Sequence, residues 1–369
     1  MKSNVQNATM PAAAAIVCVL ASAAGASAQA VCDRTIKADV VALDQAFYNN
    51  RLGSIQAGGM MFALRRDVVS SGSPGGALMP GYVMLRTDKR PRPIVLRMNV
   101  GDCLQIQFQN LLGSFASVFN ANVGNQHYPA RVAPGGAYTP NQNAKVKQSP
   151  PQTAFDLLDS QPPTRMAGVH VMGLNLVSAE APPGTPIQPV SADASWVGAN
   201  DAGAPNPSQL ASGLVGPGGR ITYTYAAKAE GAFLLYSTGA DVGDQIGFGG
   251  QLMQGLFGSV TVQPRTAEWY RSQVTKADLD LASDGQTADG HPIINYDKVY
   301  PSGPRAGQPI LKMLNQNNEI VYTDLTAIIT GPNHGAFGGS TPNPSYPNRQ
   351  QPFREFAIHY HDDLSLIHI

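Results

Sequence analysis

The sequence is poor in charged residues, and those that it has cancel. Only 14% of the 369 residues are charged, with 25 Lys+Arg against 25 Asp+Glu. A chain without net charge has no electrostatic attraction for the phosphates of nucleic acids or for an anionic membrane. We therefore expect neither of these among its partners.

Long apolar runs are also missing, apart from one near the N-terminus. Lys2 precedes a short apolar run at 11–24, and the small residues Ala26, Ser27 and Ala28 follow it. The run is shorter than the roughly 20 residues that a helix needs to cross a bilayer. The pattern predicts a signal peptide at residues 1–28 and a secreted or periplasmic protein that does not stay in the membrane. A membrane-anchoring helix is the alternative.

Cysteine is scarce, with three residues in the chain. Cys18 would leave with the signal peptide, so Cys32 and Cys103 would remain. Two cysteines in an oxidising compartment most simply pair, which predicts a Cys32–Cys103 disulfide. A free catalytic or metal-binding thiol is the alternative, although no histidine lies near either cysteine in the sequence.

Glycine and proline are abundant, at 38 and 29 residues, which is typical of short strands joined by turns. Apolar residues alternate with polar ones along several segments, as in strands with one buried face. These segments are 94–98, 104–109, 221–225 and 260–262. A short apolar run at 233–236 is consistent with a further, central strand. The pattern predicts an all-β sandwich or closed barrel.

The chain divides into regions of different composition. Polar stretches at 133–165 and 179–219 predict long surface loops, and 267–282 predicts a short helix. Turn-forming residues begin at 284, where we place a boundary between a first domain, 29–283, and a partial second unit, 284–363. Strands of that second unit are expected at 310–314, 320–322 and 356–360.

The final six residues, 364–369, read Leu-Ser-Leu-Ile-His-Ile. One reading frame of a common transposon-end sequencing adapter encodes this hexapeptide. We therefore expect a non-native tail on a truncated chain, and a genuine terminal strand is the alternative.

Several segments resemble one protein family in order and spacing. Residues 93–111 are similar to the strand, Gly-Asp turn and second strand that open a cupredoxin domain of the multicopper oxidases. Residues 168–173 resemble the family's His-x-His-Gly segment, and residues 231–238 its Gly-Thr-Phe-Trp-Tyr-His-Ser-His segment. The remaining resemblances, to the family's Asp…Pro-Gly…Tyr stretch and its Gly-Leu-x-Gly closing strand, lie at 193–196, 217–225 and 254–260.

This resemblance implies a cupredoxin-like Greek-key β-sandwich or barrel. The later segments at 324–332 and 353–363 are similar to the junction between domains in the large, ceruloplasmin-like members of bacterial type. Such proteins oxidise a reductant one electron at a time at a mononuclear copper and reduce dioxygen at a trinuclear copper cluster. The resemblance therefore implies copper in the full-length parent and downstream cupredoxin domains as partners within the same chain.

This chain departs from the family at the copper ligands. In the family, His-x-His motifs supply two imidazoles from one strand face, because residues i and i+2 point the same way. Met172 stands at the second histidine of the first motif, and Tyr236 and Thr238 stand at both histidines of the later one. Thioether and hydroxyl groups do not replace imidazole for Cu(II). No His-Cys-His sequence is present either, so we expect no catalytic residues in this segment.

Three histidines remain as candidate metal ligands. His359 and His361 have i, i+2 spacing and would share one strand face, opposite Phe356 and Ile358. The alternative is a wet strand face that begins the next domain. His170 is the third candidate, and a structural histidine is its alternative reading.

The sequence thus predicts the N-terminal, copper-free cupredoxin region of a secreted multicopper oxidase-like protein, itself inactive when alone. The parent's reductant would be a phenol or a low-valent metal ion. A copper-free cupredoxin-fold scaffold or binding module, without catalysis, is the alternative function.

Overall fold

The computed structural model describes residues 32–48, 55–56, 58–72, 75–113, 165–181, 185–186, 213–239, 251–330 and 352–360. The predicted signal peptide (1–28), the predicted tail (364–369) and most of the two predicted loops lie outside these residues.

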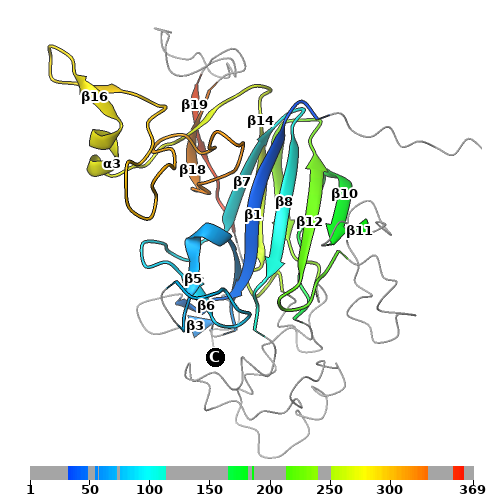
Figure 1. The fold of residues 1–369 in the computed structure, drawn as a ribbon. Coiled ribbons are helices and arrows are strands. Elements are labelled where there is room, and N and C mark those ends of the chain that lie inside the picture. Colours follow the sequence, from blue (N-terminus) through cyan, green and yellow to red (C-terminus); the bar gives the residue numbers. More distant parts are fainter. Residues whose placement is uncertain are drawn as a thin grey trace, which may run out of the picture. The chain divides into compact units, whose positions relative to one another are not determined.

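The larger sheet has six strands in the order β11-β10-β12-β8-β1-β4 (Figure 1). β1 lies parallel to β8, and the other neighbours are antiparallel. Such a parallel contact needs a crossover connection, because a tight hairpin joins only antiparallel strands. The strands are β1 (Thr35–Asp44), β4 (Met60–Leu64), β8 (Cys103–Asn110), β10 (Asn175–Ala181), β11 (Thr185–Pro186) and β12 (Arg220–Ala226).

The second sheet has four strands in the order β7-β14-β13-β9, with β7 parallel to β14. Its strands are β7 (Ile94–Asn99), β9 (His170–Val171), β13 (Gly231–Tyr236) and β14 (Phe257–Gln263). Alternate side chains of both sheets meet in one buried cluster, to which Leu96 and Val260 contribute from this sheet and Ile106 and Tyr223 from the larger one. The two sheets therefore form a β-sandwich around a shared core.

A third sheet has three strands in the order β15-β18-β19. Its strands are β15 (Trp269–Arg271), β18 (Thr326–Ile329) and β19 (Phe353–Phe356), and α3 (Lys276–Leu281) follows β15. The remaining elements are short: β2 (Phe47–Tyr48), β3 (Ile55–Gln56), the 3-10 helix η1 (Arg65–Asp67), β5 (Val68–Ser70), β6 (Val83–Leu85), β16 (Ser283–Gln286) and β17 (Pro292–Ile294).

The prediction of an all-β fold is confirmed, and all five strands predicted in the first domain are present as β7, β8, β12, β13 and β14. The helix predicted over 267–282 is wrong in its first half, because Trp269–Arg271 pairs with β18 as a strand. The strands predicted at 310–314 and 320–322 form only isolated bridges. No helix among the described residues is long and apolar enough to cross a membrane.

The predicted boundary at 284 stays a prediction. Strands from both sides of it pair in the third sheet, since β15 precedes it and β18 and β19 follow it. Met313 and Ile329 also belong to the same buried cluster as the sandwich residues. The segments after 284 therefore share a core with the β-sandwich.

Candidate functional site

The two segments that resemble the family's histidine motifs lie side by side. β9 pairs antiparallel with β13, which places His170 opposite Tyr236 and Val171 opposite Leu235. Val171 and Leu235 belong to the core, so His170 and Tyr236 project from the opposite side, which we call the outer face of the four-stranded sheet. The rings of His170 and Tyr236 meet edge to face with centroids 5.1 Å apart.

A network of hydrogen bonds between buried polar groups connects these two segments. The Ser237 hydroxyl donates a hydrogen bond to Gln251 Oε1 at 2.6 Å and accepts one from the Gly168 backbone N–H at 3.3 Å. Gln251 Nε2 in turn donates to the Met166 carbonyl at 2.8 Å. Ser237 and Gln251 are both fully buried. Gln251 could not be singled out from the sequence, because it belongs to no motif and lies outside both segments.

The four positions where the family carries imidazoles hold one imidazole here. His170 is buried, with 5% of its surface exposed, whereas Met172 is 53% exposed. Thr238 is buried, and Tyr236 uses its ring against His170. A cluster of copper ions needs several neutral imidazoles, which a thioether, a phenol and a hydroxyl do not replace. The residues present therefore do not fit the family's trinuclear cluster.

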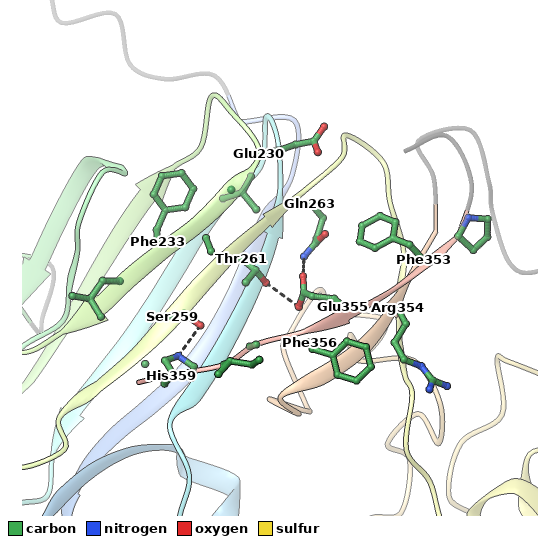
Figure 2. Close-up of a pocket in the computed structure, with 18 residues that line it drawn as sticks. Glu230, Phe233, Ser259, Thr261, Gln263, Phe353, Arg354, Glu355, Phe356 and His359 are labelled. Carbon is green, nitrogen blue, oxygen red and sulfur yellow. Dashed lines mark hydrogen bonds between the residues drawn. The ribbon is translucent and has the colours of Figure 1, made fainter. Parts of the chain in front are cut away.

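His359 lies in residues 352–360, an extended segment that we call the C-terminal strap. Its Nε2 atom is 3.1 Å from Ser259 Oγ on β14 (Figure 2). Its ring centroid is 5.9 Å from that of Phe257. Burial lowers the pKa of His359 below its usual value. His359 therefore faces the sheet, whereas Phe356 and Ile358 are exposed.

The candidate metal ligands do not form a group within the described residues. His170 and His359 are both on the outer face, but His170 belongs to β9 and His359 lies over β14, with β13 between these strands. No group of three His, Cys, Asp or Glu side chains gathers there that could hold a metal ion. His361 lies outside the described part of the chain, so its pairing with His359 stays a prediction.

Besides its pairing with β18, the strap is held by a largely buried ion pair. Arg97 on β7 contacts Glu355 with Nε–Oε1 and Nη2–Oε1 distances of 2.9 and 2.7 Å, and its Nη1 donates to the Asp324 carbonyl at 2.9 Å. Thr261 donates to Glu355 at 3.4 Å, and the Gln263 side-chain amide donates to it as well (Figure 2). These contacts fix Glu355 above β7 and β14.

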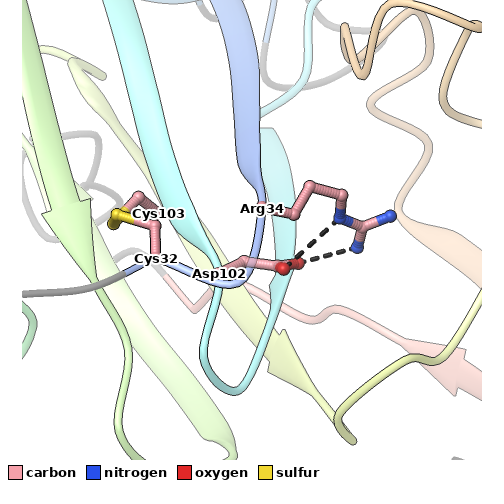
Figure 3. The surroundings of a disulfide bond; sticks show 4 residues. All are labelled: Cys32, Arg34, Asp102 and Cys103. Carbon is pink, nitrogen blue, oxygen red and sulfur yellow. Dashed lines mark hydrogen bonds and ion pairs between the residues drawn. A yellow bond between two sulfur atoms is a disulfide. The ribbon is translucent and has the colours of Figure 1, made fainter.

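Cys32 and Cys103 form a disulfide with their Cα atoms 5.4 Å apart (Figure 3). It joins the residues just before β1 to the first residue of β8. Next to it Arg34 contacts Asp102 through two hydrogen bonds, at 3.3 and 2.7 Å. Both connections tie the start of β1 to the turn before β8.

Comparisons with known proteins give only distant structural likenesses. No protein-family model matches the chain, and no curated protein matches it. A multicopper oxidase from Pseudomonas thermotolerans has 12% identity and a TM-score of 0.27 over 62% of this chain and 30% of its own. A second multicopper oxidase has 15% identity and a TM-score of 0.26 over 62% of this chain and 42% of its own. A copper nitrite reductase from Nitrosomonas europaea has 11% identity and a TM-score of 0.24 over 62% of this chain and 49% of its own.

The chain thus spans less than half the length of each of these three structures. At these TM-scores the likenesses carry no argument about the fold. The description of the fold rests on the strand orders and registers of this chain.

Proposed function

We propose that this chain is the copper-free N-terminal cupredoxin region of an exported multicopper oxidase-like protein. The observation that carries the proposal is the pairing of β9 with β13. It brings together the two segments that resemble the family's histidine motifs, yet His170 is the one imidazole at the four ligand positions. The arrangement of the motif segments is retained, and the ligand chemistry is lost.

In this proposal the parent couples one-electron oxidation of a phenol or a low-valent metal ion to dioxygen reduction. Its copper ions bind to imidazoles and a thiolate of cupredoxin domains further along the same chain. This segment supplies no ligands for the copper cluster and shapes those domains by packing against them.

The exposed side of the C-terminal strap supports this packing role. Phe356, Ile358 and Tyr360 are 61%, 69% and 92% exposed, and they alternate with residues that face the sandwich. Exposed apolar residues in a row are typical of surfaces that another protein element covers. We propose that the downstream cupredoxin domains cover this row.

The Cys32–Cys103 disulfide supports the proposal that the parent is exported. Disulfides persist in oxidising compartments and are rare in the cytosol, and this one closes a separation of 71 residues. Together with the predicted signal peptide, it supports a secreted or periplasmic location for the parent.

Copper loading tests the proposal directly. We expect the 369-residue chain, incubated with excess Cu(II) and then passed over a chelating column, to retain far less than one copper per chain by elemental analysis. It should show no blue absorption band and consume no oxygen with a phenol or Fe(II). Stoichiometric copper together with oxygen consumption would overturn the proposal.

A matched gain-of-ligand variant controls for the geometry. Met172→His, Tyr236→His and Thr238→His together restore the family pattern at the four positions. We expect this triple variant to retain more copper than the natural chain, because the β9–β13 register places position 236 directly opposite His170 and the other two positions follow these two strands. Equal retention by both would show that these positions do not correspond to the family's ligand positions.

A further inference from the structure

A groove runs alongside the C-terminal strap, with a volume of about 990 Å³. Its floor is formed by residues 230–234, 258–259 and 261–263, which belong largely to β13 and β14, and residues 352–359 of the strap form its wall (Figure 2). The contacts of Glu355 and His359 place the strap above β14. β13 is the next strand, and Ala232 and Leu234 of β13 are exposed on the outer face. The groove therefore lies over the uncovered part of β13.

One edge of β19 has no strand beside it among the residues that the structure describes. β19 is the last strand in the order β15-β18-β19, and the Ala357 N–H donates to the Leu325 carbonyl at 2.7 Å. In an antiparallel pair, alternate residues direct both backbone groups to the same neighbour. Phe353 and Glu355 therefore bond to β18, and the N–H and C=O groups of Arg354 and Phe356 point away from it.

Within the part of the chain that the structure describes, these backbone groups of Arg354 and Phe356 make no hydrogen bond. A strand edge with unpaired backbone groups is a ready template for another strand. An ordinary small ligand would not satisfy a row of alternating donors and acceptors, whereas an extended backbone does so by its own repeat.

We propose that the groove binds an extended peptide strand of a partner polypeptide, which pairs with Arg354 and Phe356 as a fourth strand of the β15-β18-β19 sheet. Alternate side chains of this peptide face the floor, where Ala232 and Leu234 favour small or β-branched apolar residues. The other side chains extend the exposed row of Phe356 and Ile358. The site goes beyond the proposed function and does not depend on copper.

Selection of peptides tests the proposal without a known partner. Phage-displayed random heptapeptides are selected on the purified 369-residue chain and then measured as synthetic peptides by titration calorimetry. We expect the selected peptides to alternate apolar, β-branched residues with others. In nuclear magnetic resonance spectra they should shift the amide signals of Arg354, Phe356 and Leu234.

A pair of substitutions at one position isolates the backbone hydrogen bond. Phe356→Ala removes the ring and keeps the N–H, whereas Phe356→Pro removes both, and this N–H is not needed by β18. We expect peptides to bind the Pro variant at least about tenfold more weakly than the Ala variant. Leu234→Glu, on the separate strand β13, should weaken binding as well, because it places a charge on the apolar floor.

Three outcomes would overturn the proposal. One is a selection that enriches no peptide, and another is equal binding to the Ala and Pro variants when both keep the wild-type thermal unfolding midpoint. If the Pro variant does not fold, the Leu234→Glu variant takes its place, and peptides that bind this variant as tightly as the natural chain would also overturn the proposal. The third is a concentration-dependent dimer, seen by sedimentation and abolished by Phe356→Pro, which would make a second copy of the chain the occupant. None of these outcomes depends on whether the chain binds copper.

Discussion

Arg97 carries its charge at a position where only 2% of its side chain is exposed. Burial lowers the pKa of this guanidinium, and the carboxylate of Glu355 opposes the shift. The two residues are separated by 258 positions in the sequence, so their pairing depends on the three-dimensional fold. A buried charge of this kind is stable only while its partner is in place.

Removal of Glu355 should therefore be costly. We expect Glu355→Leu to lower the free energy of unfolding by about 3–5 kcal/mol, because it leaves the Arg97 charge buried without a carboxylate. The double variant Arg97→Met, Glu355→Leu should recover most of this loss, since no buried charge then remains. Urea denaturation measures both.

The surface pair of Arg86 and Asp88 provides the control. Asp88 is 52% exposed, so Asp88→Ala should change the free energy of unfolding by less than about 1 kcal/mol. A loss from Glu355→Leu no larger than the loss from Asp88→Ala would contradict the assignment of a buried, structurally important pair.

At the scale of elements, the C-terminal strap directs two polar side chains inward, next to the core-packed Phe353, and carries an apolar row on its exposed side after Arg354. Glu355 and His359 face the sandwich, whereas Phe356 and Ile358 are exposed. An isolated soluble domain usually shows the reverse arrangement. The strap is therefore suited to lie between two layers, which is the common basis of the packing proposal and of the strand-binding groove.

Acidification should weaken the strap through His359. Burial lowers the pKa of His359, so the folded state favours the neutral ring. A group with a depressed folded pKa contributes stability above its unfolded pKa, about 6.5, and loses it as the pH falls toward the folded pKa. We expect the free energy of unfolding to fall below about pH 6.5 more steeply for the natural chain than for His359→Asn.

The Asn variant can keep a hydrogen bond to Ser259 but does not titrate in this range. All other side chains are the same in both proteins, so the difference between the two stability curves reports on position 359. Urea denaturation from about pH 7.5 to pH 5.5 gives these curves. Parallel curves would show that His359 is not desolvated in the folded protein.

Local patterns in the sequence predict the elements where apolar residues recur at every second position along one strand. β7, β8 and β12 were predictable because their apolar residues have period 2 and glycine-containing turns precede β8 and β12. For Trp269–Arg271 the sequence predicts a helix, because the neighbouring residues also fit helical spacing. Its strand conformation depends on β18, with which Trp269 pairs at Ile329, and no local pattern contains that partner.

The candidate site shows the same limit. Residues 168–173 and 231–238 could be singled out by their resemblance to known motifs, but no local pattern contains their pairing with each other. Gln251 and the Arg97–Glu355 pair could not be recognised, because a lone amide or an ion pair across the fold leaves no periodic signal in the sequence. Contacts between distant segments were therefore the part that the sequence did not predict.

For the whole molecule, the disulfide is the covalent connection between the segment before β1 and β8, and its effect can be measured. A crosslink restricts the unfolded chain, and the stabilisation grows slowly with the length of the closed loop. For a separation of 71 residues we expect the double variant Cys32→Ala, Cys103→Ala to lose about 4 kcal/mol of unfolding free energy.

A reductant separates the loss of the crosslink from the loss of packing around Cys103, which is buried. Dithiothreitol should lower the stability of the natural chain toward that of the double variant and leave the variant unchanged. β1 and β8 lie in parallel register over eight pairs, from Thr35↔Cys103 to Ala42↔Asn110. We therefore expect the reduced chain to keep its far-ultraviolet circular dichroism spectrum. A reduced chain as stable as the oxidised one would show that strand pairing alone fixes the N-terminal segment, and that the crosslink adds nothing measurable to the fold.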